Sequence, residues 1–162
     1  MIVLGIDPGT ATTGYGLVRD AENGPEVVAY GALLTPAGAP MPERLVLLYQ
    51  QLQAVIAQHR PVTGAVEKLF FQKNVSTAMT VGQARGVALL AMAQAGLTIG
   101  EYTPRDVKQA VAGYGAADKR QMQGMVQAVL NLAELPRPDD AADALAVAIC
   151  HLHSARLKAL IG

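Results

Sequence analysis

The sequence predicts one α/β domain spanning residues 1–162, with five strands and helices packed around them. The first observation is composition: 51% hydrophobic and 16% charged residues supply apolar side chains for one sizeable core. The second is that short β-branched runs alternate with longer segments of helical periodicity. The predicted strands lie at 2–6, 12–17, 26–34, 62–66 and 97–102, and helices at 45–59, at 75–95, from 103 and from 139.

The first strand brings an acid to its end. Residues 2–6 are almost entirely β-branched or aliphatic, Asp7 follows, and Pro8-Gly9 terminates the run. An ordinary turn is one interpretation, because Asp and Gly are common turn residues. A cation site is the other, since burying an unpaired carboxylate is costly and a bound cation would relieve that cost. Gly14 and Gly16 are expected to leave room above this acid.

A second acid stands at another strand end. The turn Asn23-Gly24-Pro25 separates two extended segments, so the first three strands should be sequential and antiparallel. The helix over 45–59 then covers one face of the sheet. The short strand that follows ends at Glu67, which repeats the arrangement of Asp7.

Both phenylalanines of the chain come directly after this acid. Phe70 and Phe71 lie between Lys68 and Lys73. Adjacent residues of a strand point to opposite faces, so at least one ring is expected in the core. The other would lie near the acid, where an aromatic ring flanked by lysines could stack against DNA bases.

The segment 75–95 predicts a helix of small residues, with Gly82 and Gly86 on one face. Such a smooth helix packs closely against another element of the chain or against a second copy in a dimer. After the fifth strand, Thr103-Pro104-Arg105-Asp106 has a capping-box pattern that opens a helix. Lysines on this helix and the next are expected to face solvent.

The last helix carries three acids at its start. Asp140 and Asp143 share a helix face, but Asp139 and Asp143 do so almost equally well, so spacing leaves both pairs open. Capping and the helix dipole also favour Asp at such a position. His151 and His153, nearer the far end, are expected at the surface rather than as metal ligands. Cys150 is expected to be buried, and a single cysteine cannot form an internal disulfide.

Acids from two strand ends and one helix start would make an all-oxygen site. Such a site suits Mg²⁺ or Mn²⁺ and argues against zinc. Two such ions about 4 Å apart can activate water and stabilise a leaving oxygen in phosphodiester cleavage. A metal-dependent nuclease is therefore the predicted class.

Charge distribution is compatible with a nucleic-acid partner. The net charge is zero, yet residues 60–120 contain eight Lys/Arg against four Asp/Glu, while residues 1–59 contain two against five. Chance unevenness of a solvated surface is the alternative. The chain starts with the first strand rather than a signal-like segment, which predicts a soluble cytoplasmic protein with no membrane association.

The sequence resembles the RuvC family of Holliday junction resolvases, within the ribonuclease H-like superfamily. The resemblance covers almost the whole chain and rests on several motifs together: Gly5-Ile-Asp-Pro-Gly9, Thr13-Gly-Tyr-Gly16, Val66-Glu67, Phe70, Lys73-Asn74, Gly82-Gln-Ala-Arg-Gly86 and Asp140-Ala-Ala-Asp-Ala-Leu145. It implies a mixed sheet, three antiparallel strands followed by two parallel ones, flanked by helices on both faces.

The resemblance also assigns residues and partners. It implies that Asp7, Glu67, Asp140 and Asp143 bind two Mg²⁺ per subunit, replaceable by Mn²⁺, which favours Asp140 over Asp139. It implies DNA contacts by Phe70 rather than Phe71, and by Lys73, Arg85, Lys108 and Lys119. Family members are homodimers that nick two strands of like polarity across a four-way junction, leaving 5′-phosphate and 3′-hydroxyl ends. The RuvA and RuvB branch-migration complex is the expected further partner.

Two other functions compete with this prediction. Asp-Pro-Gly-Thr followed by Thr-Gly also resembles the phosphate loop of actin-type and sugar-kinase ATPases, although those proteins use two such domains. A non-catalytic junction-binding protein is the second alternative. The presence of all four acids argues against it.

Overall fold

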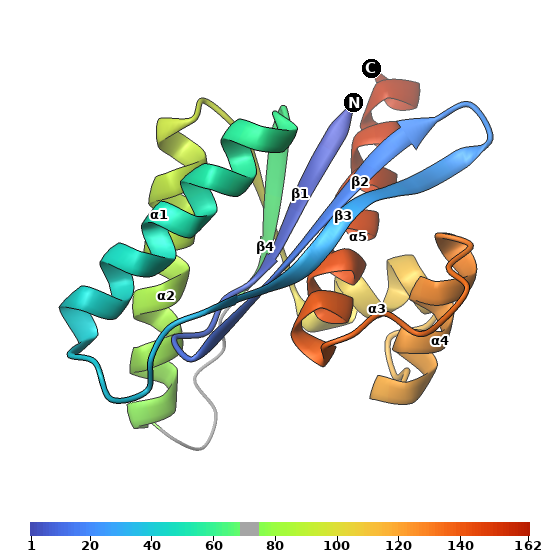
Figure 1. Cartoon of the computed structure of the whole chain (residues 1–162). Helices are drawn as coiled ribbons and strands as arrows, with labels where there is room; N and C mark the ends of the chain where they lie inside the picture. The colour runs from blue at the N-terminus through green and yellow to red at the C-terminus, as the bar shows by residue number, and fades with distance from the viewer. Residues whose placement is uncertain (69–74) are drawn as a thin grey trace.

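A computed structural model of the chain describes residues 1–68 and 75–162. Its centre is a five-stranded sheet in the order β3-β2-β1-β4-β5 (Figure 1). β1, β2 and β3 are antiparallel neighbours, and β4 and β5 run parallel to β1. The predicted mixed sheet is confirmed. The strands are β1 Ile2–Asp7, β2 Thr12–Ala21, β3 Gly24–Leu34, β4 Thr63–Glu67 and β5 Thr98–Tyr102.

Helices cover both faces of the sheet. Figure 1 shows α1 and α2 on one side and α5, with α3 and α4 against it, on the other. The predicted capping box of α3 is confirmed, because Thr103 Oγ1 accepts from Asp106 N at 3.1 Å and Asp106 Oδ2 accepts from Thr103 N at 2.9 Å. The helices are α1 Met41–His59, α2 Val75–Gln94, α3 Pro104–Ala112, α4 Lys119–Val129 and α5 Asp139–Ile161.

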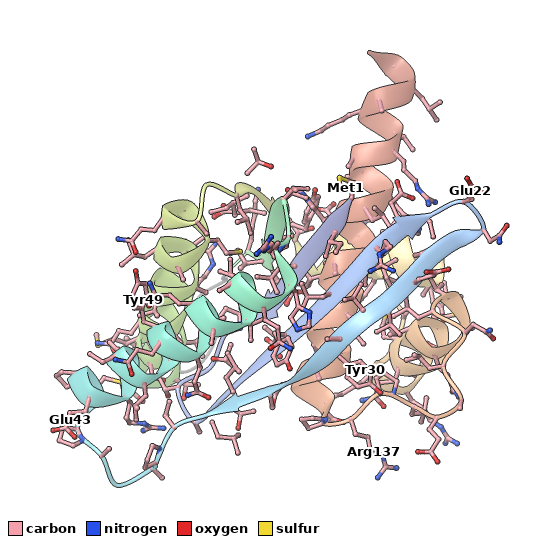
Figure 2. All side chains as sticks on the ribbon, turned by 45° about the horizontal axis from the view of Figure 1, so that its top comes forward. Met1, Glu22, Tyr30, Glu43, Tyr49 and Arg137 are labelled. Atoms are coloured by element: carbon pink, nitrogen blue, oxygen red, sulfur yellow. The ribbon has the colours of Figure 1, made fainter. Side chains whose placement is uncertain are left out.

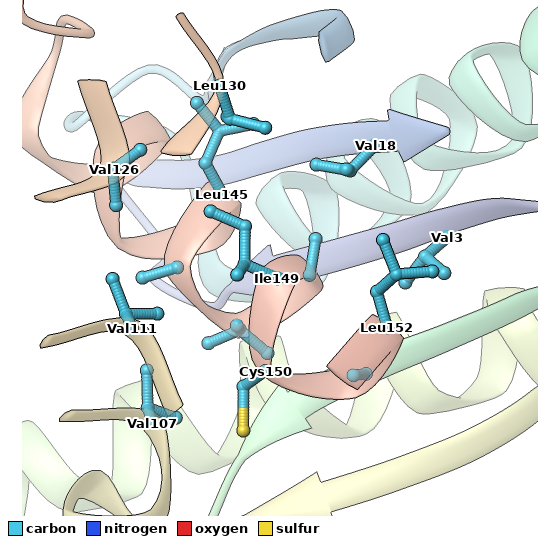
Figure 3. Close-up of a cluster of buried hydrophobic side chains, with 14 residues drawn as sticks. Val3, Val18, Val107, Val111, Val126, Leu130, Leu145, Ile149, Cys150 and Leu152 are labelled. Carbon is cyan, nitrogen blue, oxygen red and sulfur yellow. The ribbon is translucent and has the colours of Figure 1, made fainter. Parts of the chain in front are cut away.

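The sheet separates two cores, because alternate residues of each strand point to opposite sides. Leu4, Ile6 and Val66 pack beneath α1 and α2. Figure 3 shows the other core, in which Ile149 and its neighbours on α5 face Val3 and Val18 of the sheet. Burial of these large side chains anchors α5 across the central strands.

Glycines let α5 lie directly on those strands. A Cβ atom on Gly14 would overlap the main-chain oxygen of Asp140, and one on Gly5 would overlap that of Ala144. A Cβ on Gly16 would meet the side chain of Leu145 at 2.7 Å. Gly14 and Gly16 do leave room beside the end of β1, as predicted, and α5 fills it.

α5 is also long and apolar enough to cross a membrane by length and composition alone. Its buried residues explain that composition, because they form the core between the helix and the sheet. Those residues are Ala141, Ala142, Ala144, Leu145, Ala146, Val147, Ala148, Ile149, Cys150 and Leu152.

Candidate active site

Three carboxylates meet where β1 ends and α5 begins. Asp7 is the last residue of β1, and Asp140 and Asp143 lie one helical turn apart in the first turns of α5. One oxygen from each of the three lies within 4.8 Å of the others, and all three residues are half-buried. The close contact of α5 with the glycines of β1 and β2 is what brings these acids from opposite ends of the chain together.

Asp139 is held outside this group. Its Oδ1 accepts from Gln123 Nε2 at 3.0 Å, and its Oδ2 lies 3.2 Å from Lys119 Nζ. The Asp139 side chain is 63% exposed. The structure thus separates two acids that helical spacing treats as nearly equivalent: Asp140 joins Asp7 and Asp143, whereas Asp139 faces α4.

The carboxylates of the three-acid cluster repel one another. Burial, followed by the charges of Asp143 and Asp140, raises the pKa of Asp7 to about 8. Burial is also the main cause that raises the pKa of Asp143. A cation bound among these oxygens would remove the repulsion, and carboxylate oxygens are ligands that Mg²⁺ and Mn²⁺ accept. The residues therefore fit a hard divalent metal.

Glu67 lies beside the cluster of Asp7, Asp140 and Asp143 and is not one of its members. Burial and then the charge of Asp143 raise the pKa of Glu67, while Lys108 acts in the opposite direction. Glu67 and Asp143 also line a cavity of about 250 Å³ between α3, α4 and α5. Lys108 and Lys119 line this cavity too, so two of the three lysines predicted to contact DNA lie next to these acids.

Arg85 is engaged within the chain. Its Nη2 pairs with Glu101 Oε1 at 2.7 Å, and its Nε donates to the main-chain oxygen of Glu67 at 3.4 Å. The other predicted DNA contacts of this region, Phe70 and Lys73, lie outside the described residues, as does Phe71.

Comparison with known proteins identifies the family to which the chain belongs. The model of the family "Crossover junction endodeoxyribonuclease RuvC" matches residues 3–151. The chain belongs to the RuvC family. This membership removes the support for the kinase-type ATPase alternative, which rested on the first loop alone.

Relatives of the RuvC family match along nearly their whole length. A crossover junction endodeoxyribonuclease RuvC from Chloroflexus aurantiacus is 64% identical over 155 residues, covering 96% of this chain and 94% of the relative. One from Desulfitobacterium hafniense is 58% identical over 162 residues, covering 100% and 98%. The structure of Thermus thermophilus RuvC with a Holliday junction substrate has a TM-score of 0.91 at 37% identity, covering 98% of this chain and 96% of that one.

His151 does not lie at the surface, so the prediction for this residue is wrong. Its half-buried ring lies 2.7 Å from Thr63 Oγ1 through Nε2 and 2.7 Å from the Tyr102 hydroxyl through Nδ1. Gly100 makes this possible, because a Cβ there would meet the ring at 2.5 Å. His153 is partly buried as well, with Nδ1 3.2 Å from the oxygen of Ala110. Neither histidine belongs to the carboxylate cluster found among the described residues.

Cys150 is buried, as predicted, and burial raises the pKa of its thiol to about 12. A thiol held in its neutral form is a poor nucleophile and a poor metal ligand. Packing is therefore the role that its surroundings support.

Sequence reasoning missed three residues around the site. Glu101 pairs with Arg85, and Gln123 holds Asp139. Arg137 lines an open hollow of about 820 Å³ next to Asp140, and Figure 2 shows its side chain extending outward from the loop before α5. The available signal for Glu101 was a charged residue near the end of a predicted strand. The other two carry no comparable signal.

Proposed function

We propose that this chain is a Mg²⁺-dependent endonuclease that resolves four-way DNA junctions in recombination and repair. It would nick two strands of like polarity symmetrically and leave 5′-phosphate and 3′-hydroxyl ends. The single observation that carries this proposal is the meeting of Asp7, Asp140 and Asp143 in a chain of the RuvC family. A relative of that family has been solved with a Holliday junction substrate.

The four carboxylates of Asp7, Glu67, Asp140 and Asp143 would hold two Mg²⁺ ions, with Mn²⁺ as a substitute. The bound metal would supply activation of water and stabilisation of the leaving oxygen. Asp7 extends from the central strand, between the α5 acids and the strand that carries Glu67, and is therefore the acid best placed to serve both ions.

Lys108 and Lys119 would bind phosphates of the DNA backbone from the cavity beside Glu67. In the free protein Lys119 pairs with Asp139, and both partners are more than half exposed. Exposed ion pairs contribute little stability, so Lys119 can exchange this partner for a phosphate. Phe70 as the ring inserted at the junction, and Lys73 as a backbone contact, remain predictions from the sequence.

A homodimer would place two such sites on one junction. Support comes from an apolar groove of about 320 Å³ between α1 and α2, which is lined by Leu45, Val46, Tyr49, Gln50, Gln53, Val87 and Leu90. Figure 2 shows Tyr49 on this side of the molecule. We further propose that residues 1–162 form one nuclease domain in the cytoplasm and that RuvA and RuvB deliver the junction to it.

The test is cleavage mapping on a four-way junction and on a linear duplex of the same arm sequence, with and without Mg²⁺. The proposal expects paired, symmetric nicks on the junction alone, and only with the metal. Tight junction binding with no nicks under any divalent ion would instead support the non-catalytic alternative. Equal cutting of the linear duplex would contradict junction selectivity.

A further inference from the structure

Arg85 connects the α2 layer to the strand end that carries Glu67. Its Nη2 atom contacts Glu101 Oε1 at 2.7 Å, and its Nε atom contacts the Glu67 main-chain oxygen at 3.4 Å. The Arg85 side chain is only 18% exposed. A guanidinium has five N–H groups in a rigid fork, so one side chain can hold two acceptors on neighbouring strands.

We propose that Arg85 is a positioning residue for Glu67 rather than a contact to DNA. This inference rests on the proposed function, because it takes Glu67 to be a metal ligand. It assigns Glu101, which no motif singled out, as the residue that orients Arg85.

Arg85 approaches Glu67 from the side of the sheet opposite the Glu67 carboxylate. Val66 packs in the core beneath α1 and α2, so the alternation of side chains directs Glu67 to the α5 side, where the charge of Asp143 acts on it. Glu101 follows Ile99 at a spacing of two and therefore shares the α2 side. Arg85 thus holds the main chain of Glu67 from behind while its carboxylate faces the acids of α5.

The position of Glu67 explains why such a contact is useful. The parallel pairing of β1 with β4 ends at Ile6 and Val66, one residue before Glu67. On the β5 side, Lys68 N donates to the oxygen of Tyr102 at 2.6 Å. A metal ligand has to be held within about 0.5 Å of its productive position, and groups behind the ligand supply that constraint. Arg85 supplies it where pairing with β1 has stopped.

The test compares Glu101→Gln, which removes the ion pair and keeps its shape, with Arg85→Lys, which keeps the charge and loses the fork. Glu26→Gln, an exposed acid on β3, is the control for the loss of one negative charge. Three quantities are measured on the full chain: Mn²⁺ affinity of the protein alone by calorimetry, junction affinity without divalent ions, and the Mn²⁺ concentration for half-maximal nicking.

We expect Glu101→Gln and Arg85→Lys each to weaken Mn²⁺ binding roughly tenfold and to shift the nicking midpoint by a similar factor. Metal-free junction affinity should stay unchanged, and the double variant should be no worse than either single one, because both remove the same interaction. Glu26→Gln should match the wild type in all three measurements.

A Glu101→Gln protein with wild-type Mn²⁺ affinity would overturn the inference. So would an Arg85→Lys protein that loses metal-free junction affinity while Glu101→Gln does not, because that pattern identifies a DNA contact. If the wild-type protein nicks junctions, either of these results counts against this inference alone and leaves the proposed function standing. A wild-type protein that neither binds Mn²⁺ nor nicks junctions would instead refute the proposed function.

Discussion

Gly14 lies directly beneath the main chain of Asp140, so close that a Cβ on the glycine would overlap the aspartate's carbonyl oxygen. Gly14 is paired with Asp7 across β1 and β2. One glycine therefore sits next to one acid of the cluster and beneath another. The distance between the acids depends on how closely α5 approaches the sheet at this point.

Gly14→Ala should push the start of α5 away from the sheet. We expect a loss of about 1–3 kcal/mol in the free energy of unfolding, because a side chain is forced into filled space. Metal binding should weaken with it. Denaturant unfolding and Mn²⁺ calorimetry measure the two effects.

Gly124→Ala is the matched control, since Gly124 lies in α4 and a Cβ added there would have no neighbouring atom within 4 Å. Alanine there should stabilise the protein by about 0.5–1 kcal/mol. If Gly14→Ala unfolds like the wild type, the close packing of α5 on β2 does not hold the site together.

The metal-free protein should lose stability as pH rises from 5 to 8. Folding raises the pKa of Asp7 from 3.8 to about 8, so the folded state favours the protonated acid. The stability from this preference is present below the unfolded pKa and is lost as pH rises through the folded one. Asp7→Asn cannot ionise and should lose about 2 kcal/mol less over this interval.

Thermal unfolding in a chelator across that pH range checks the prediction. Mg²⁺ should restore stability to the wild type at pH 8 and leave Asp7→Asn nearly unaffected, because only the wild type retains the complete ligand set. Parallel pH profiles for the two proteins would show that folding does not raise the pKa of Asp7.

Asp140→Asn and Asp139→Asn should differ sharply in nicking. The first removes an oxygen of the cluster and should reduce the rate by about a hundredfold or more, while the second alters an exposed acid bound to Lys119. Junction affinity of both proteins should remain measurable. Single-turnover nicking at saturating Mg²⁺ gives the comparison, and equal losses would mean that both acids serve the metal.

Lys119→Ala should weaken junction binding and reduce the slope of log affinity against log salt by about one, the value for one lost phosphate contact. Fluorescence anisotropy over a series of salt concentrations without divalent ions measures this slope. Lys158→Ala, at the exposed far end of α5, is the control of equal charge change. An unchanged slope for Lys119→Ala would place that lysine away from the DNA backbone.

Local patterns predicted the sheet and its helices because those patterns report burial over a few neighbouring residues. Short apolar, β-branched runs identified the strands that end at Asp7 and Glu67, and the Thr103 motif identified the start of α3. His151 was misplaced for the same reason. Its burial depends on Gly100, a residue distant in sequence that leaves space for the ring.

By itself, the sequence determined the fold class and the set of acids from which a metal site could be built. Helical spacing left Asp139 and Asp140 nearly equivalent, since both are spaced to share a helix face with Asp143, and only the family resemblance favoured Asp140. The tertiary structure gives the physical reason, because the rotation of α5 is decided by its packing on Gly5, Gly14 and Gly16. That packing turns Asp140 toward Asp7 and leaves Asp139 to Lys119, a distinction that arises from contacts between opposite ends of the chain.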